Sequence, residues 1–447
     1  MVPSESTLSR NKRFEFQGLN LILLEENQDP KATRPNSEHE GSVIAVLNLS
    51  LVTFLILLGL SMVAPILPTY AESFQVSYTL VGFVVSAFAV TRMVLDMPAG
   101  LLSRRFDKKG IMIVGLVLLS TSSVLAGFAP SYVILVIARM IEGAGSALYV
   151  TTATVFLAQI SGEEKRGQWM SLYMGMLLLG AIFGPTFGGI LAETYDIRAP
   201  FFAYAVITGF AIVPTLTLPK LSNSTNSASP LEVRGILSDM REVLSNPSFL
   251  LVTFAVFTMF FLRTGVRSTL IPLFAANNLG MDSATIGLIL TIGGITTALT
   301  ITPMGSISDR IGRKIPLALC LVLTAGITLL FPFSTNLLML SIIMAIYGAV
   351  IGLQGPSAAY VTDVSPQDKL EISMGLYRMI SDFGFVMGPL LLGFLADVTA
   401  TPVPGATHSG LIGMFPFLVA SIILVTAFFV LLRAGDPARD RIKNHST

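Results

Sequence analysis

Ionisable side chains interrupt several of the longest apolar runs in this sequence. They are Arg92, Asp96, Arg139, Glu142, Arg263, Arg267, Arg378 and Asp382. A charge at the centre of a lipid bilayer costs at least ~2.5 kcal/mol unless it is paired or faces water. Residues that carry this cost are therefore candidates for moving protons or for binding a charged ligand.

Three of these runs hold an arginine followed three or four residues later by a carboxylate. The pairs are Arg92 with Asp96, Arg139 with Glu142, and Arg378 with Asp382. On a helix this spacing places both groups on one face, so we expect each pair to neutralise itself. Arg92 and Asp96 lie near the predicted cytoplasmic end of their run, where a structural role that orients the helix is an equal alternative.

Two of the carboxylates lie deep in their runs. Glu142 is about eleven residues from the outer end, which is roughly 16 Å along a helix and near the middle of a ~30 Å hydrocarbon core. Asp382 lies at a similar depth. Desolvation favours the neutral acid and a nearby arginine favours the charged one, so the balance can place proton binding near physiological pH. We predict that Glu142 or Asp382 carries a coupled proton, with Arg139 and Arg378 as partners.

Arg263 and Arg267 have no acid on their own run. They need a partner elsewhere or an anionic ligand. We therefore predict that they face a substrate cavity, together with Tyr149 and Tyr377. Packing in an apolar interior is the plainer alternative for the tyrosines.

Composition identifies a polytopic membrane protein. Mean hydropathy is +0.74 and 12% of residues are charged, whereas a soluble domain carries roughly 25% charge. A net charge of +1 does not indicate a nucleic-acid partner. Cys320 is the only cysteine, and the sequence contains neither metal-spaced histidines nor a nucleophile triad. We expect no enzymatic activity, no metal and no cofactor.

Twelve apolar runs are long enough to cross a bilayer as helices. They lie near residues 43–70, 78–100, 110–128, 131–157, 167–192, 199–219, 248–276, 281–304, 315–333, 336–361, 371–397 and 410–433. Lysine and arginine gather in the even-numbered loops, so we expect both termini in the cytoplasm and the protein in the plasma membrane. The predicted parts are a tail 1–42, a six-helix bundle 43–219, a linker 220–247, a second bundle 248–434 and a tail 435–447.

The two bundles repeat one another. A charged glycine turn at residues 305–314 has a degraded copy at 100–109, 205 residues earlier, and Gly184-Pro185 recurs as Gly388-Pro389 at an offset of 204. The repeat predicts an all-α membrane fold of two pseudo-symmetric six-helix bundles. In that arrangement the substrate passes between the bundles, and one bundle rocks against the other.

The chain resembles the major facilitator superfamily in three motifs. Residues 305–314 match its turn signature G-x-L-a-D-r-x-G-r-k, whereas the first copy has Arg104 for aspartate and Asp107 for glycine. Residues 139–145 resemble the helix 4 motif R-x-x-q-G-x-g, tied to proton transfer, with Glu142 for glutamine. Residues 180–189 resemble the helix 5 motif g-x-x-x-G-P-x-x-G-G, found chiefly in drug:proton antiporters.

The resemblance implies two further sets of residues. The gating set is Gly100, Arg104, Arg105, Gly305, Asp309, Arg310, Gly312, Arg313 and Glu371. The packing set is Gly180, Gly184, Pro185, Gly188, Gly189, Gly388 and Pro389, because glycines four apart let helices approach and proline permits a bend. We expect Arg104 to pair with Glu371 or Asp368 as a cytoplasmic latch, with a solvated loop arginine as an equal alternative. Asp309 should lie near Arg166.

The leading functional prediction is proton-coupled export of small apolar or cationic compounds by a monomer in the bilayer. An organic anion or a sugar is the alternative substrate, which the unpaired Arg263 and Arg267 would serve. A membrane sensor or membrane enzyme is a different class. It would need a soluble signalling domain or a reactive cluster, and the sequence shows neither.

Overall fold

A computed structural model describes residues 35–161, 166–221, 233–402 and 410–439. The chain divides into residues 1–41 and residues 42–447, and the second unit holds every element from α2 onward. Most of the predicted N-terminal tail lies outside the described residues.

Helices make up nearly all of the described chain. The first seven are α1 (Pro35–Val63), α2 (Leu67–Glu72), α3 (Tyr78–Arg105), α4 (Lys108–Gly127), α5 (Tyr132–Ile160), α6 (Arg166–Thr194) and α7 (Ala199–Leu216). We call them the N-terminal half. A separate helix, α8 (Val233–Ser245), follows in the predicted linker.

The remaining elements form the C-terminal half. They are α9 (Pro247–Leu262), η1 (Arg263–Leu270), α10 (Ile271–Asn277), α11 (Ser283–Ile311), α12 (Lys314–Thr328), η2 (Phe331–Phe333), α13 (Leu337–Ile351), η3 (Gly352–Gln354), α14 (Ser357–Val364), η4 (Gln367–Lys369), α15 (Leu370–Thr399), β1 (Thr401–Pro402), β2 (Gly410–Leu411) and α16 (Phe415–Leu431). The two short strands pair antiparallel.

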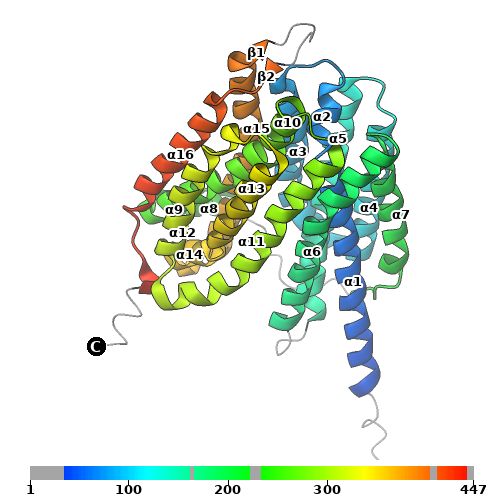
Figure 1. The fold of residues 1–447 in the computed structure, drawn as a ribbon. Helices are drawn as coiled ribbons and strands as arrows, with labels where there is room; N and C mark the ends of the chain where they lie inside the picture. Colours follow the sequence, from blue (N-terminus) through cyan, green and yellow to red (C-terminus); the bar gives the residue numbers. More distant parts are fainter. Residues whose placement is uncertain (1–34, 162–165, 222–232, 403–409, 440–447) are drawn as a thin grey trace, which may run out of the picture. The chain divides into compact units, whose positions relative to one another are not determined.

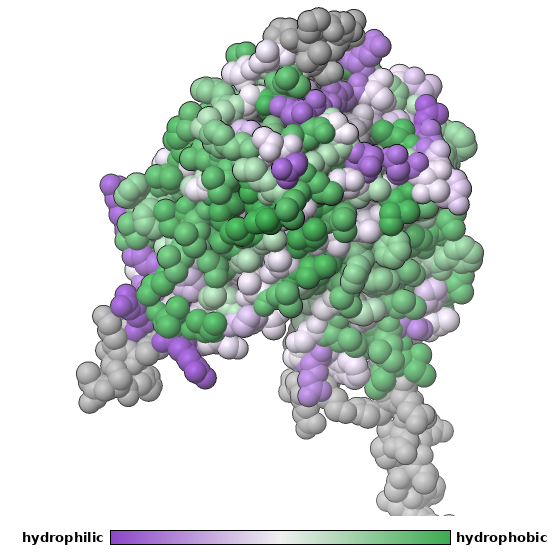
Figure 2. Space-filling view, viewed as in Figure 1, coloured by the Kyte–Doolittle hydropathy of each residue, from purple (hydrophilic) through white to green (hydrophobic). Residues whose placement is uncertain are grey.

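The described residues contain eleven helical spans long and apolar enough to cross a membrane. A twelfth apolar helix, α16, has 17 residues. Many large apolar side chains on these helices are exposed, and Figure 2 shows how they cover most of one face. Because such a surface suits lipid rather than water, the predicted multi-span helical fold is confirmed.

Two of the membrane-competent spans are interrupted near their middle. The span at 247–277 contains the π-helical segment η1, where the hydroxyls of Ser268 and Thr269 donate to carbonyls five residues earlier. Pro272 follows and cannot donate a backbone bond to the preceding turn. In the span at 337–364, a Gly-Leu-Gln-Gly-Pro sequence forms η3 between α13 and α14. Breaks of this kind often mark functional positions in membrane helices.

The two halves meet along two helix pairs. α3 packs against α15, and α6 packs against α11, as Figure 1 shows for the second pair. A Cβ on Gly82 of α3 would lie 2.2 Å from the carbonyl oxygen of Pro389, and a Cβ on Gly287 of α11 would lie 2.2 Å from that of Pro185. Only glycine allows these backbones to touch.

These close contacts lie toward one end of the helices. At the opposite end, which carries the charged turns 104–109 and 311–314, α6 and α11 diverge toward the lower edge of Figure 1. The surface is hollowed there between them (Figure 2). Gly375, near the same end of α15, has nothing within 4 Å of its Cβ position. We call this the basic end and the other the outer end. The halves are closed together at the outer end and apart at the basic end.

One contact occurs in both halves. The ammonium of Lys109 donates to the carbonyl of Leu216, where α7 ends. Lys314 Nζ donates to the carbonyl of Leu432 at 2.6 Å, just after α16. Each lysine thus holds the last helix of its own half through an end carbonyl that lacks a helical partner.

Candidate transport site

A cluster of charged side chains joins the two halves. Arg92 Nη2 on α3 lies 3.1 Å from Asp382 Oδ1 on α15, and Arg92 Nε lies 3.8 Å from Asp96 Oδ2 on its own helix. The side chain of Asp382 is 7% exposed and that of Arg92 is 29% exposed. The ion pair therefore crosses the boundary with its carboxylate buried and its guanidinium within reach of water.

The predicted pairing of Arg378 with Asp382 is wrong. Arg378 is exposed and makes no ion pair within the described part of the chain. The packing of α3 on α15 explains the change, because Ser86 Oγ donates to the carbonyl of Val386 at 2.6 Å and holds the two helices in register. Arg92, farther along α3, then faces Asp382. A buried pair between packed helices replaces the pair that spacing along one helix suggested.

Arg139 and Glu142 form a second, fully buried pair on α5. The Arg139 guanidinium lies 5.0 Å from the ring centre of Phe88 on α3, which favours the cation. Phe88 in turn packs with Val386 of α15. Among the described side chains, Glu142 Oε1 has no hydrogen-bond partner. This carboxylate therefore lies inside the N-terminal half, behind Phe88, with one oxygen free to hold a proton.

The π-helical segment η1 holds two arginines with different surroundings. Arg267 Nη2 donates to the carbonyl of Leu290 on α11 at 3.0 Å. The Arg263 side chain is exposed, and no residue that the structure describes accepts a hydrogen bond from its guanidinium or forms an ion pair with it. The sequence analysis treated the two as one pair of unpaired cations. Neither has an acidic partner among the described residues, but Arg267 donates to a backbone carbonyl whereas the Arg263 guanidinium has no described acceptor.

The two predicted cavity tyrosines are not alike. Tyr149 on α5 is fully buried, and its hydroxyl lies 3.1 Å from Thr53 Oγ1 of α1. It lines no accessible cavity in this conformation and packs inside the N-terminal half. Tyr377 on α15 is half-buried beside Ser357 of α14. Neither tyrosine reaches Arg263 through a contact that the structure records.

The intact charged turn is held by its own half. Arg313 Nε lies 2.5 Å from Asp363 Oδ2, and Arg313 Nη2 lies 3.5 Å from Asp309 Oδ1. Asp436, after α16, accepts from the backbone amide of Lys314 at 3.0 Å and so caps α12. Gly312 has φ +92°, and a Cβ there would meet the Asp436 carboxylate. The Cβ position of Gly100 meets only Thr151 of its own half, and that of Gly305 has nothing within 4 Å.

The side chains of Arg104, Glu371 and Arg166 lie outside the described residues. The predicted latch between Arg104 and Glu371 and the predicted approach of Asp309 to Arg166 therefore stay predictions. Asp368, the other proposed partner, is exposed.

The outer end carries a latch that sequence reasoning missed. Asp397 at the end of α15 accepts from the backbone amides of Tyr78 and Thr79 at 2.6 and 2.7 Å. Nearby, Asn277 Nδ2 donates to both carboxylate oxygens of Glu72 at 2.9 and 3.1 Å, joining α10 to α2. The only sequence signal is that Asp397 follows Glu193 by 204 residues, the same offset that relates Gly388-Pro389 to Gly184-Pro185. These bonds tie the halves together at the end where they are closed.

The glycine motif of α6 serves two interfaces. Gly180, Gly184 and Gly188 face the backbone of α1, whereas Gly189 lies against Ser283 at the start of α11, in the other half. Gly388 of α15 lies against Phe261 near the end of α9 and against Gly265 of η1. Motif positions four residues apart thus let α1 approach α6, and the neighbouring Gly189 helps to join the halves.

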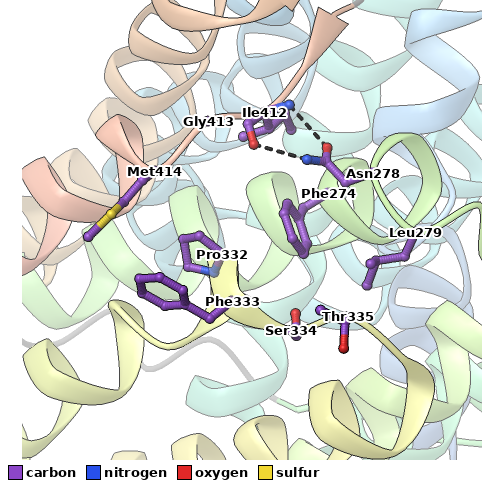
Figure 3. A pocket seen from close by; sticks show the side chains of 10 residues that line it. All are labelled: Phe274, Asn278, Leu279, Pro332, Phe333, Ser334, Thr335, Ile412, Gly413 and Met414. Atoms are coloured by element: carbon purple, nitrogen blue, oxygen red, sulfur yellow. Dashed lines mark hydrogen bonds between the residues drawn. The ribbon is translucent and has the colours of Figure 1, made fainter.

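A separate pocket of about 510 Å³ opens at the outer end of the C-terminal half. It is lined by Phe274, Asn278, Leu279, Pro332, Phe333, Ser334, Thr335, Ile412, Gly413 and Met414 (Figure 3). Asn278 is occupied by paired hydrogen bonds with the backbone of Ile412, both at 3.0 Å. The pocket is not part of the charged cluster. The described residues also hold no group of three or more His, Cys, Asp and Glu side chains that could bind a metal.

Two helical halves with a charged cluster at their boundary define a class, the secondary membrane transporters. The chain belongs to the Major Facilitator Superfamily, whose family model matches residues 49–266 and 253–446. Members of this family are transporters rather than enzymes.

Curated relatives agree with this assignment, and solved structures share the fold. The chain is 25% identical over 392 residues to Multidrug resistance protein 1 of Bacillus subtilis, covering 86% of this chain and 95% of that protein. It is 24% identical over 349 residues to Quinolone resistance protein NorA of Staphylococcus aureus, covering 77% and 88%. In fold it is similar to the nucleoside transporter NupG, with a TM-score of 0.71, 14% identity and coverage of 88% and 100%. It is also similar in fold to a bacterial homologue of the human lysosomal transporter Spinster, with a TM-score of 0.73 and 16% identity. That match covers 90% of this chain and 98% of the Spinster homologue.

Proposed function

We propose that this protein exports small apolar or cationic compounds in exchange for protons, by alternating access. The observation that carries the proposal is the ion pair between Arg92 and Asp382, because it links a titratable group to the contact between the halves. Two relatives whose names include multidrug and quinolone resistance support export. We further propose that the protein lies in the plasma membrane with both termini in the cytoplasm.

The conformation fits one step of this cycle. If the basic end faces the cytoplasm, as its lysines and arginines predict, the halves are open inward and closed outward. A compound could then enter from the cytoplasm and reach the level of Arg92. Release on the other side requires the contacts of the outer end to part.

Asp382 is the better candidate for the coupling proton. When it is charged, it pairs with Arg92 and links the halves. When it is protonated, Arg92 keeps only its weaker contact with Asp96, so the link loosens. Glu142 pairs within its own helix and so has no direct hold on the other half. Exchange follows if a substrate and a proton compete for this cluster, since each state then carries only one of them.

Vesicles containing the purified protein test the proposal. An imposed pH gradient should drive ethidium movement, and a protonophore should stop it. Asp382→Asn should abolish the gradient-driven movement but leave ethidium binding intact. Glu142→Gln should slow transport and keep its dependence on the gradient. Glu193→Gln, at an exposed site on α6, is the control. Ethidium movement by Asp382→Asn that still follows the gradient would refute the role of this acid.

A second candidate, transport of an organic anion, is favoured by the free charge of Arg263. The two candidates share the fold and the gating contacts. They differ in the charge that the substrate presents to the site.

A further inference from the structure

We propose that Arg263 binds a carboxylate or similar anionic group on the transported compound. This inference rests on the second candidate of the proposed function, transport of an organic anion, and deepens it by naming the group on the substrate that the protein would bind. Arg263 lies midway along the span at 247–277, where an unpaired charge facing lipid is costly. Its side chain is nevertheless exposed, and none of the described residues neutralises it.

The surroundings of Arg263 indicate that it faces the space between the halves. Its segment η1 packs against α3 and α15, the helix pair that joins the halves. The charge of Arg92 on α3 and the hydroxyl of Tyr347 on α13 both act on it electrostatically. From these neighbours we infer that Arg263 is exposed to water through the opening at the basic end rather than to lipid.

The charges around this space do not cancel. Arg92 contacts both Asp96 and Asp382, which leaves one excess negative charge, and the charge of Arg378 also acts on Asp382 and offsets that excess. Arg263 remains without an acid among the described residues to offset it. The space therefore holds unmatched positive charge on the side of the C-terminal half, which attracts an anion and repels a cation.

The geometry also favours an aromatic anion. Phe260, one helical turn before Arg263, packs with Phe385 of α15 at a ring separation of 6.0 Å. Thr264 Oγ1 donates to the carbonyl of Phe385 at 3.1 Å and fixes η1 to α15 beside these rings. A guanidinium binds a carboxylate through two parallel hydrogen bonds, and neighbouring rings suit a flat apolar body.

Rhodamine B and its ethyl ester test the assignment, because they differ only in whether the carboxylate is free. Dissociation constants would be measured by fluorescence anisotropy on the purified full-length protein. Arg263→Gln should weaken rhodamine B about tenfold or more, the usual effect of losing a charged hydrogen bond, and change the ester less than twofold. Arg263→Lys should retain part of the preference. Arg433→Gln, an exposed arginine beyond α16, should change neither dye.

Two results would overturn the proposal: no saturable binding of rhodamine B to the wild type up to millimolar concentration, or an equal change for both dyes in Arg263→Gln. Thermal unfolding of each variant separates these results from misfolding. The proposed transport function is judged separately, by pH-driven movement of whichever dye binds in vesicles. Binding through Arg263 without such movement would support the anion site and contradict the transport proposal.

Discussion

Asp397 of α15 caps the first turn of α3 in the opposite half, with its Oδ2 atom 2.7 Å from the amide of Thr79. The hydroxyl of Thr79 donates to the same oxygen. Ser77, the residue directly before α3, contributes less to the cap, because its Oγ accepts only a 3.5 Å hydrogen bond from the amide of Leu80. The exposed amides at the start of a helix carry partial positive charge, so a carboxylate is favoured there. The contact between the halves at the outer end therefore depends on a helix cap in which a residue of the C-terminal half caps a helix of the N-terminal half.

Removing this cap should shift the protein away from the state that is open at the basic end. A lost cap costs roughly 0.5–2 kcal/mol, which corresponds to a change of about 2- to 30-fold in the ratio of states. In a Cys320→Ser background, Gly375→Cys reports the opening at the basic end through labelling by a membrane-impermeant maleimide. Asp397→Ala should reduce the labelling rate. Glu193→Ala removes the exposed acid at the repeat-related position of α6 and should not.

The pair of Arg92 and Asp382 should show strong coupling in stability. Removing one partner of a buried ion pair leaves an unpaired charge and typically costs 3–5 kcal/mol, whereas removing both costs less. Arg92→Gln and Asp382→Asn should each lower the unfolding temperature in detergent more than the double variant does. Additive losses in the double variant would mean that the two side chains do not depend on each other.

Gly188 should tolerate no side chain. A Cβ there would lie 2.0 Å from the carbonyl oxygen of Met62 on α1, and backbone cannot move aside cheaply. Gly188→Ala should therefore cost about 1–3 kcal/mol or prevent assembly. Gly175→Ala on the same helix is the matched control, since nothing lies within 4 Å of that position. Size-exclusion profiles and unfolding temperatures of the two variants provide the comparison.

Lys369 should anchor α8 to the start of α15 at all physiological pH values. The hydrogen bond that Lys369 donates to the Glu242 carboxylate, with the added negative charge of Asp239, raises the pKa of Lys369 above its usual range. Because the folded-state pKa is raised, the Lys369 ammonium makes its full contribution to stability at any pH below its unperturbed pKa of about 10.4. This contribution is lost only as the pH rises through the higher folded-state pKa. Lys369→Gln should increase hydrogen exchange of the α8 amides at pH 7. Unchanged exchange would show that apolar packing alone holds this helix.

The main features of the fold could be predicted from the sequence. Long apolar runs can satisfy their backbone groups in lipid only as helices, so their number and extent are local properties. The recurrence of Gly184-Pro185 as Gly388-Pro389 predicted two related halves, because a repeat can be recognised from the sequence alone. The break at η1 was not predicted, because wide helical turns depend on side-chain bonds such as that of Thr269 to Thr264.

The sequence by itself determined which charges lie within the membrane, since that depends only on where they fall along an apolar run. The tertiary structure alone decided their partners. Spacing along one helix placed Asp382 with Arg378, but the packing of α3 on α15 gave it Arg92 and left Arg378 exposed. Likewise Arg267 found a carbonyl on α11 and Arg263 found none. A buried charge pairs with whichever opposite group the packed neighbour brings closest, and that distance exists only once the helices are assembled.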